Sequence, residues 1–332
     1  MDLEMLRERA RIIRRVRSFF DDRKYLEVDT PLLAPDLIPE SCLEVFETSR
    51  CAPAGGGCEK RSCWLVPSPE IWMKRIIARH RTSVYQICKC FRNGESSGRL
   101  HSPEFTMLEY YTMDADYMDS LALTESLFAH LAERAGQEFL LPPFARITAA
   151  EAFGRWAGLD LFEAAEKKGG MEAEARRLGL DPMPGLSVPA LYDLIFIHVV
   201  EPRLKQERPV VLLDYPSFVP CLAQRSAESH DGAKTFERWE LYYRGIELAN
   251  CYSEETDPVK VRAFFETEAA AKKASALVNH RVDPDYWKHF LPRRGRPFPR
   301  CSGVALGLDR LIMALTGRST IDEVLPFPME RL

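Results

Sequence analysis

The segment that most constrains the fold lies near the C-terminus, where an apolar run with glycines leads directly into a helical pattern. It reads Cys301-Ser302-Gly303-Val304-Ala305-Leu306-Gly307-Leu308-Asp309-Arg310-Leu311. Glycine lets a backbone pass close to a ligand, and arginine carries a permanently charged donor fork that suits phosphate oxygens. We therefore predict a buried strand followed by a helix, with Arg310 facing a phosphate. A strand and helix whose arginine forms only a surface ion pair would share the pattern.

A second segment predicts a β-hairpin that can hold a nucleotide. Residues 84–87 and 105–113 have strand patterns, and glycines and serines between them are typical of a turn. We expect Arg92 to bind the α-phosphate, His101 to lie near the outer phosphates and Phe105 to stack on the base.

A third segment, at the N-terminus, predicts an amphipathic helix that runs into a short strand ended by Pro31. Its apolar stripe contains Ile12, Ile13, Val16, Phe19 and Phe20. Such a stripe needs a partner surface, which is either the chain's own core or a second subunit. Further along we expect a helix over 118–135, strands over 210–215 and 239–248, and a helix over 258–279.

In this order along the chain, the three segments resemble the signature motifs of class II aminoacyl-tRNA synthetases, and further residues resemble the lysyl branch. These are Ser68-Pro69-Glu70, Pro103-Glu104-Phe105-Thr106-Met107-Leu108-Glu109 and Gly245-Ile246-Glu247-Leu248-Ala249-Asn250. The resemblance implies an α+β fold, a class II aminoacyl-tRNA synthetase-like catalytic domain with a mainly antiparallel sheet flanked by helices. We expect residues 1–332 to form a single domain, with a mainly helical insertion at about 145–208 and without an anticodon-binding barrel.

Within the lysyl branch, a stand-alone catalytic domain resembles the ligases that attach (R)-β-lysine to a lysine of translation elongation factor P. Ala305 stands where lysyl-tRNA synthetases have a glycine, and the ligase family is similar in having alanine there. One added methyl in an amino-acid pocket is worth about 1–3 kcal/mol of specificity. The alternative is a neutral exchange of glycine for alanine in a strand.

The resemblance also implies the residues of an ATP site and of an amino-acid site. Arg92 and Arg310 are expected to be catalytic, as fixed cations that stabilise charge on the α-phosphate. The expected ATP contacts are Arg92, Glu95, His101, Ser102, Phe105, Glu247, Leu248, Gly307 and Arg310. The expected substrate contacts are Ser68, Glu70, Glu109, Tyr111, Asn250, Glu254 and Ala305. Glu247 and Glu254 are expected to hold Mg²⁺, because that ion prefers oxygen ligands.

Several carboxylates in one pocket suit a diamino acid, because a dry ammonium group must be paired. Some positions depart from the lysyl pattern. Ser102 stands where asparagine is usual, and Cys251 and Tyr252 replace a Gly-Phe pair beside Asn250. Among the acids of the hairpin loop, we favour Glu95 as the contact of the adenine amino group.

The composition bears on whether the chain binds RNA or a membrane. The formal charge is −4 and the pI is near 6.1, so the chain lacks the basic footprint of an RNA binder, and tRNA is not expected as a partner. No apolar stretch reaches membrane-spanning length and the N-terminus is charged, so we expect no membrane partner and a cytoplasmic location.

The nine cysteines, an odd count without a signal sequence, indicate reduced thiols. Cys51, Cys58 and Cys63 fall in a polar segment taken as a loop, and their spacing does not favour structural zinc. Cys88 and Cys90 are explained by small apolar packing on a strand.

Three hypotheses follow. The first is a homodimeric, ATP- and Mg²⁺-dependent ligase that activates (R)-β-lysine as an adenylate and transfers it to elongation factor P. The second is a truncated lysyl-tRNA synthetase-like enzyme that activates α-lysine for another acceptor. The third is a non-catalytic nucleotide-binding regulatory paralogue, against which the charged residues Arg92, Glu247, Glu254 and Arg310 argue.

Overall fold

The structure is a computed structural model that describes residues 2–54, 57–94, 98–132, 137–226 and 234–328. The chain divides into two units, which are considered separately. The first contains Met1–Asp114, Glu255–Cys301 and Ala305–Leu332, and the second contains Ala115–Glu254 and Ser302–Val304.

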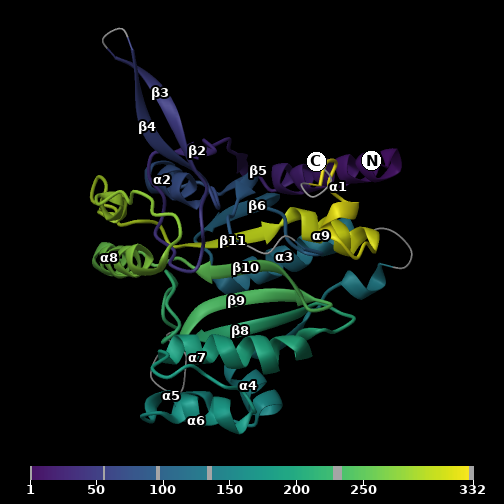
Figure 1. Ribbon diagram of the computed structural model, residues 1–332. Helices are drawn as coiled ribbons and strands as arrows, with labels where there is room; N and C mark the ends of the chain where they lie inside the picture. The colour runs from purple at the N-terminus through teal and green to yellow at the C-terminus, as the bar shows by residue number, and fades with distance from the viewer. Residues whose placement is uncertain (1, 55–56, 95–97, 133–136, 227–233, 329–332) are drawn as a thin grey trace. The chain divides into compact units, whose positions relative to one another are not determined.

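Helices of the first unit, shown in Figure 1, are α1 (Leu3–Asp22), α2 (Glu70–His80), α8 (Pro258–Ser275), α9 (Leu308–Thr316) and the short η4 (Tyr286–Phe290) and η5 (Ile321–Glu323). Its strands are β1 (Leu26–Glu27), β2 (Leu33–Ala34), β3 (Glu47–Ala54), β4 (Gly57–Leu65), β5 (Val84–Phe91), β6 (Glu104–Met113) and part of β11 (Cys301–Gly307). Neighbouring strands follow the order β1-β5-β6-β11, and β1 pairs with β5 in parallel. A separate three-stranded sheet has the order β2-β4-β3.

Helix α1 begins at Asp2, whose side chain accepts the backbone N–H of Glu4, as is typical of an N-cap. Its apolar stripe lies against the chain's own core, because Val16, Phe19 and Phe20 are fully buried. The ring of Phe20 stacks on Tyr85 of β5. The helix therefore covers one face of the β5–β6 hairpin and leaves the opposite face for other contacts.

The β5–β6 hairpin confirms the strands expected from the sequence. The two strands are antiparallel, with Val84 opposite Tyr111 and Phe91 opposite Glu104. Residues that lie directly opposite in such a pair project from the same face, and side chains alternate between faces along each strand. Tyr85 and its partner Tyr110 share the face that α1 covers.

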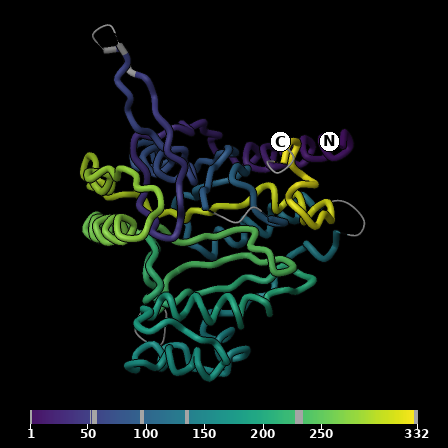
Figure 2. The backbone as a smooth tube through the Cα atoms, viewed as in Figure 1, coloured from purple at the N-terminus to yellow at the C-terminus, as the bar shows by residue number. Residues whose placement is uncertain are grey.

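Helix α9 is fixed to the hairpin through its first turn. The buried carboxylate of Asp309 accepts the backbone N–H of Thr106 at 2.6 Å and pairs with the guanidinium of Arg9 at 2.6 Å. Arg9 also donates to the hydroxyl of Thr106 at 2.9 Å and to the carbonyl of Val324. The first and last segments of the chain thus lie side by side, as Figure 2 shows.

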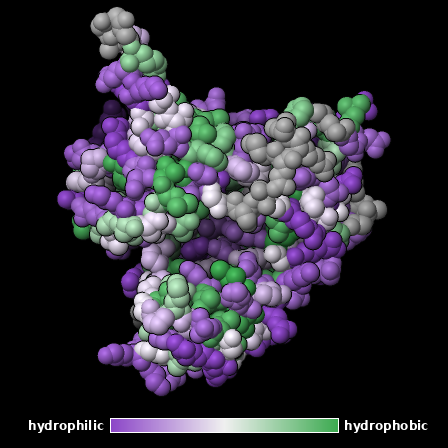
Figure 3. Space-filling view, viewed as in Figure 1, coloured by the Kyte–Doolittle hydropathy of each residue, from purple (hydrophilic) through white to green (hydrophobic). Residues whose placement is uncertain are grey.

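Residues 47–65 correct the expectation of a polar loop, because they form the long β3–β4 hairpin seen in Figure 1. Its strands carry exposed charged side chains, among them Glu59 and Arg61, which form an ion pair, and Figure 3 colours this region largely hydrophilic. The strands could not be recognised from the sequence, because polar residues occupy both faces and no alternation of apolar and polar residues is present.

The expectation of reduced thiols is also wrong for one pair. Cys51 and Cys58 form a disulfide, with Cα atoms 5.4 Å apart. The hairpin brings the two residues together by folding back between them, which the spacing of the cysteines alone does not reveal.

The helices of the second unit are α3 (Tyr117–Leu131), α4 (Ala149–Ala157), α5 (Leu161–Glu166), α6 (Gly170–Arg177), α7 (Val188–Ile195) and the short η1 (Glu138–Leu140), η2 (Phe196–Val200) and η3 (Glu201–Leu204). Its strands are β7 (Ala145–Thr148), β8 (Val210–Pro216), β9 (Thr235–Tyr243), β10 (Ile246–Ser253) and the rest of β11, in the order β11-β10-β9-β8-β7. Pairing is antiparallel between β8, β9 and β10, and parallel between β7 and β8.

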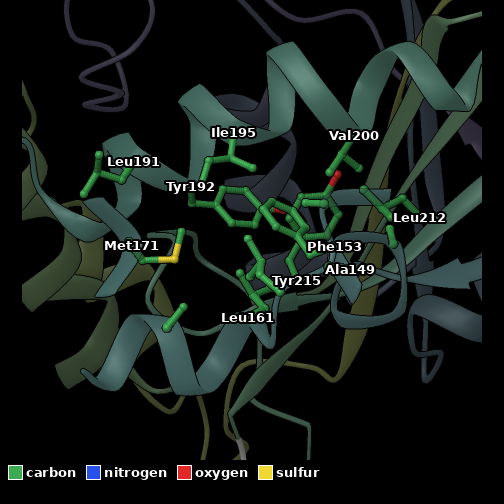
Figure 4. Close-up of a cluster of buried hydrophobic side chains, with 14 of the residues drawn as sticks. Ala149, Phe153, Leu161, Met171, Leu191, Tyr192, Ile195, Val200, Leu212 and Tyr215 are labelled. Carbon is green, nitrogen blue, oxygen red and sulfur yellow. The ribbon is translucent and has the colours of Figure 1, made fainter. Parts of the chain in front are cut away.

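Apolar side chains from α4 to α7 pack on β8 to form the core of the second unit. Figure 4 shows Phe153 and Tyr192 at its centre, where their rings stack with centroids 4.8 Å apart. Both residues are buried, as are Ile195 and Leu212. The helices between residues 149 and 204 therefore form one hydrophobic core together with strands β8 and β9.

The single strand expected over 239–248 is wrong, because two strands occupy that segment. Arg244 and Gly245 have positive φ angles of 52° and 77° and reverse the chain between β9 and β10. Glycine adopts such angles readily, and this turn was not recognised from the sequence. Among the helices of the described residues, none is long and apolar enough to cross a membrane.

Candidate active site

One face of the β5–β6 hairpin carries several of the residues expected to bind a nucleotide and an amino acid. Because α1 covers the face of Tyr85, the other face presents Phe105, Glu109 and Tyr111 of β6. Opposite them on β5 lie Cys90, Gln86 and Val84. Side chains alternate between the two faces of a strand, so residues two or four positions apart lie on the same face.

The end of this face that leads into the loop holds the expected nucleotide contacts. Arg92, just beyond β5, places its guanidinium 5.3 Å from the ring centroid of Phe105, a cation–π distance. Ser102 is buried, and His101 pairs with Gly98 in an isolated bridge at the neck of the loop. Glu95 lies outside the described residues. An arginine beside an accessible ring can bind a phosphate while the ring stacks on a base.

The motif with which the sequence analysis began adopts the expected strand and helix. Gly307 ends β11 and is the N-cap of α9, and Arg310 lies in the first helical turn. Arg310 donates through Nε to the carbonyl of Leu100, in the loop of the β5–β6 hairpin, at 3.3 Å. The start of a helix carries partial positive charge, so Arg310 lies where an anion is favoured. Ala305 is partly buried in β11.

Glu70 is less available than the sequence suggested. It is the first residue of α2, after Ser68 and Pro69, and its carboxylate pairs with Lys74 at 2.5 Å. The Lys74 side chain is only 1 % exposed, so the ammonium group depends on this partner. The charge of Glu70 is therefore largely offset within the chain.

Glu109 is a buried acid of this unit whose surroundings disfavour its ionised form. It is buried, and the hydroxyl of Tyr111 donates to its Oε1 at 2.8 Å. Burial raises the pKa of the Glu109 carboxyl well above its ordinary value, and the nearby negative charge of Glu70 acts in the same direction. A carboxyl in this state ionises readily when a cation arrives beside it.

Sequence reasoning missed Glu40, which follows the buried residues Leu37, Ile38 and Pro39. Burial raises the pKa of its carboxyl to about 7, and the charge of Glu70 adds to the shift. The positive charges of Arg92, Lys74 and Lys272 oppose it. An acid placed directly after an apolar run was the one available signal.

In the second unit, Glu247 and Asn250 share a face of β10 although they are three positions apart. Glu247 lies opposite Tyr242, Asn250 lies opposite Glu240, and a β-bulge falls between Glu247 and Ala249. In a regular strand, positions three apart face opposite ways, so the extra bulge residue aligns the two. Leu248, expected at the nucleotide, lies within this bulge and is buried.

Glu254 follows β10 directly and forms an isolated bridge with Ala223. It is 1 % exposed, whereas Glu247 is partly buried. Two carboxylates supply the oxygen donors that Mg²⁺ prefers, and this ion commonly completes its shell with phosphate oxygens and water. The donor set thus fits a magnesium ion held jointly with a nucleotide.

A buried polar network around Arg238 was also missed. Arg238 donates to Glu240 at 2.5 Å and through Nε to Oδ1 of Asn250 at 3.3 Å. Its guanidinium lies 4.3 Å from the ring of Tyr215, and Tyr242 donates to Glu240 at 2.6 Å. Because arginine can only donate, the Oδ1 atom of Asn250 faces Arg238 and the NH₂ group of the amide points away from Arg238.

Cys251 and Tyr252, the two residues that depart from the lysyl pattern beside Asn250, lie on opposite faces of β10. Tyr252 lies opposite Arg238 and therefore shares the face of Asn250. Cys251 points to the other face, is buried, and lies 3.3 Å from the hydroxyl of Ser302. Only Tyr252 is thus placed on the face that carries the expected substrate residue.

The sequence matches the family of tRNA synthetases class II (D, K and N) over residues 3–331. It is similar to proteins named elongation factor P-(R)-β-lysine ligase. The one from Pasteurella multocida is 34% identical over 328 residues, covering 99% of this chain and 96% of the relative. Those from Proteus mirabilis and Edwardsiella ictaluri are 34% and 35% identical, each covering 98% of this chain and 95% of the relative.

Proposed function

The chain belongs to the class II tRNA synthetases of the D, K and N group, and on that basis we propose that it is an ATP-dependent, AMP-forming ligase. It activates (R)-β-lysine as an adenylate and transfers the acyl group to a lysine side chain of translation elongation factor P. The relatives named for that reaction support the assignment along almost the whole chain. The observation that carries it is the β5–β6 face, where Arg92 beside Phe105 and the buried Glu109 beside Tyr111 occupy one surface.

Activation requires a carboxylate oxygen of the amino acid to attack the α-phosphorus of ATP. The new O–P bond forms as the bond to pyrophosphate breaks, and negative charge grows on the phosphate oxygens. Arg92 and Arg310 stabilise this charge as fixed cations, and Phe105 holds the adenine ring. This step needs no strong base, because the attacking carboxylate is already ionised.

In the transfer step, the ε-amine of the acceptor lysine attacks the acyl carbon. A C–N bond forms, AMP leaves with the electron pair, and the amine nitrogen loses a proton. The product is an amide, so the modification is stable once made.

Glu247 and Glu254 are the residues that would hold Mg²⁺, on the donor set described above. The ion would supply positive charge to the phosphate oxygens of bound ATP. Asn250 would bind the amino-acid portion, as the resemblance to lysyl enzymes implies, and Tyr252 shares its face of the strand.

The ammonium groups of the substrate need acidic partners. Glu109 fits this role because it is buried and its carboxyl gains charge when a cation approaches. Glu70 contributes less, because Lys74 already pairs with it. Ala305 would exclude α-lysine by its methyl group, and Ala305→Gly should raise activity with α-lysine relative to β-lysine by about tenfold.

We place the enzyme in the cytoplasm, where its protein acceptor and ATP are found, and propose that it is a homodimer without tRNA as a partner. The dimer is supported by exposed leucines in the segment after α1, of which Leu26 is 52 % and Leu33 42 % exposed. An exposed leucine of this kind can contact a second subunit.

ATP–pyrophosphate exchange measured side by side with (R)-β-lysine and α-lysine tests the activation step. A mass increase of purified elongation factor P tests transfer. Arg310→Ala should abolish exchange, whereas Arg318→Ala, a control on an exposed arginine just after the same helix, should not. Undiminished exchange in Arg310→Ala would remove Arg310 from the site. Exchange with neither isomer would reject the proposed substrate class.

A further inference from the structure

Gln86 is a buried polar side chain to which the reaction as described gives no role. It is 1 % exposed, yet neither its Oε1 nor its Nε2 has a hydrogen-bond partner among the described residues. Glu109 is 3 % exposed, and its Oε2 likewise has no partner within the described part of the chain. Buried polar atoms are nearly always hydrogen-bonded in folded proteins, so three unmet atoms in one place indicate a ligand.

The three atoms belong to one site. Gln86 and Glu109 are register partners in the β5–β6 ladder, so both side chains leave the same face with Cβ atoms about 5 Å apart. The other carboxylate oxygen of Glu109 is held by Tyr111. Glu109 is therefore oriented by its own strand, with Oε2 left for something that lies between it and Gln86.

We propose that Gln86 Oε1 and Glu109 Oε2 together receive one ammonium group of a diamino acid, which makes Gln86 a substrate-recognition residue. This inference rests on the proposed function for the identity of the ligand. An alkylammonium offers three N–H donors, and this pair offers two acceptors. The Nε2 of Gln86 can then donate to the ionised carboxylate of Glu109.

The surroundings favour a cation over an anion. The raised pKa of Glu109 reflects burial and the charge of Glu70, and a bound ammonium group would relieve both effects. The ammonium group of Lys74, whose charge lowers the pKa of Glu109, is paired with Glu70. A second carboxylate in place of Gln86 would stand directly opposite Glu109 and repel it, whereas an amide supplies an acceptor without a charge.

Calorimetric titration of the full chain tests the proposal without requiring turnover. The ligands are (R)-β-lysine, 3-aminohexanoate, which lacks the amine at carbon 6, and 6-aminohexanoate, which lacks the amine at carbon 3. We expect Gln86→Met to weaken (R)-β-lysine binding by tenfold or more, and to weaken only one of the two monoamines. The monoamine affected identifies which ammonium group Gln86 receives.

Two variants guard against a loss of structure. Gln86→Asn keeps an uncharged amide acceptor at the position and should weaken (R)-β-lysine binding less than Gln86→Met does. Gln206→Met, which replaces a glutamine bonded locally to the Arg203 carbonyl, should change nothing. ATP affinity of Gln86→Met should equal that of the parent.

Equal affinities of Gln86→Met and the parent for all three ligands would overturn the proposal, and so would an equal loss for all three. A parent chain that binds none of the three amines would overturn it as well. Binding that depends on Gln86 in a chain without pyrophosphate exchange would instead uphold the recognition site and reject the proposed function.

Discussion

The contact of Asp309 with Arg9 and Thr106 offers the sharpest test of how the arginine helix is held. Asp309 is 1 % exposed and Arg9 is 8 % exposed, so neither charge is well solvated. Replacing Asp309 with alanine would leave the Arg9 guanidinium and the Thr106 N–H buried without their acceptor. Breaking a buried ion pair on one side costs about 3–5 kcal/mol.

That cost should appear as a fall of the melting temperature on the order of 5–10 °C, measured by circular dichroism. Arg9→Leu should destabilise comparably, because it leaves the Asp309 carboxylate uncompensated. The double variant Arg9→Leu/Asp309→Ala should lose clearly less than the sum of the single changes, since neither charge then remains buried. Pyrophosphate exchange should fall in Asp309→Ala even well below its melting temperature, because Arg310 follows Asp309 in the same turn.

Two results would refute this reasoning. Additive losses in the double variant would show that Arg9 and Asp309 are not coupled. A loss below about 1 kcal/mol in Asp309→Ala would match an exposed ion pair and contradict the burial of the contact.

Three further outcomes are expected. Because the pKa of Glu40 is raised to about 7 in the folded chain, its contribution to stability is present at acidic pH and is lost as the pH rises through 7. The melting temperature of the parent should therefore fall more between pH 5 and pH 8 than that of Glu40→Gln, and equal slopes would contradict the shift. Reduction of the Cys51–Cys58 disulfide, which closes a short loop, should remove about 2–3 kcal/mol of local stability and speed amide hydrogen exchange in residues 47–65 while leaving pyrophosphate exchange intact. Leu26→Asp should convert a homodimer to a monomer in sedimentation, and a parent chain that sediments as a stable 38 kDa species would refute the dimer.

The β5–β6 hairpin and the β11–α9 turn were predictable because their signals are local. Alternating apolar residues mark a strand, and a glycine before an apolar helical pattern marks a turn into a helix. The positions of Arg92 and Arg310 followed from those signals. The β3–β4 hairpin gave no such signal, because charged residues occupy both of its faces, and its disulfide depends on a fold-back that the spacing does not encode.

The roles expected for the site residues remain predictions, yet the structure changes how several of them can act. Glu70 is paired with Lys74, and Asn250 is oriented by Arg238. Neither of these two contacts was expected from the sequence. Both contacts depend on burial, which makes a hydrogen bond or ion pair obligatory where it would be optional in water.

The sequence by itself determined the β5–β6 hairpin, the glycine and arginine at the start of α9, and the chemistry of the side chains, because each of these depends on residues close together in the chain. Only the tertiary structure decided which side chains share a surface. The β-bulge in β10 aligns Glu247 with Asn250, and the register of β5 on β6 sets Gln86 opposite Glu109. Strand register is chosen by pairing between distant segments, and a shift of one residue would turn each side chain to the opposite face, so no local pattern could have fixed it.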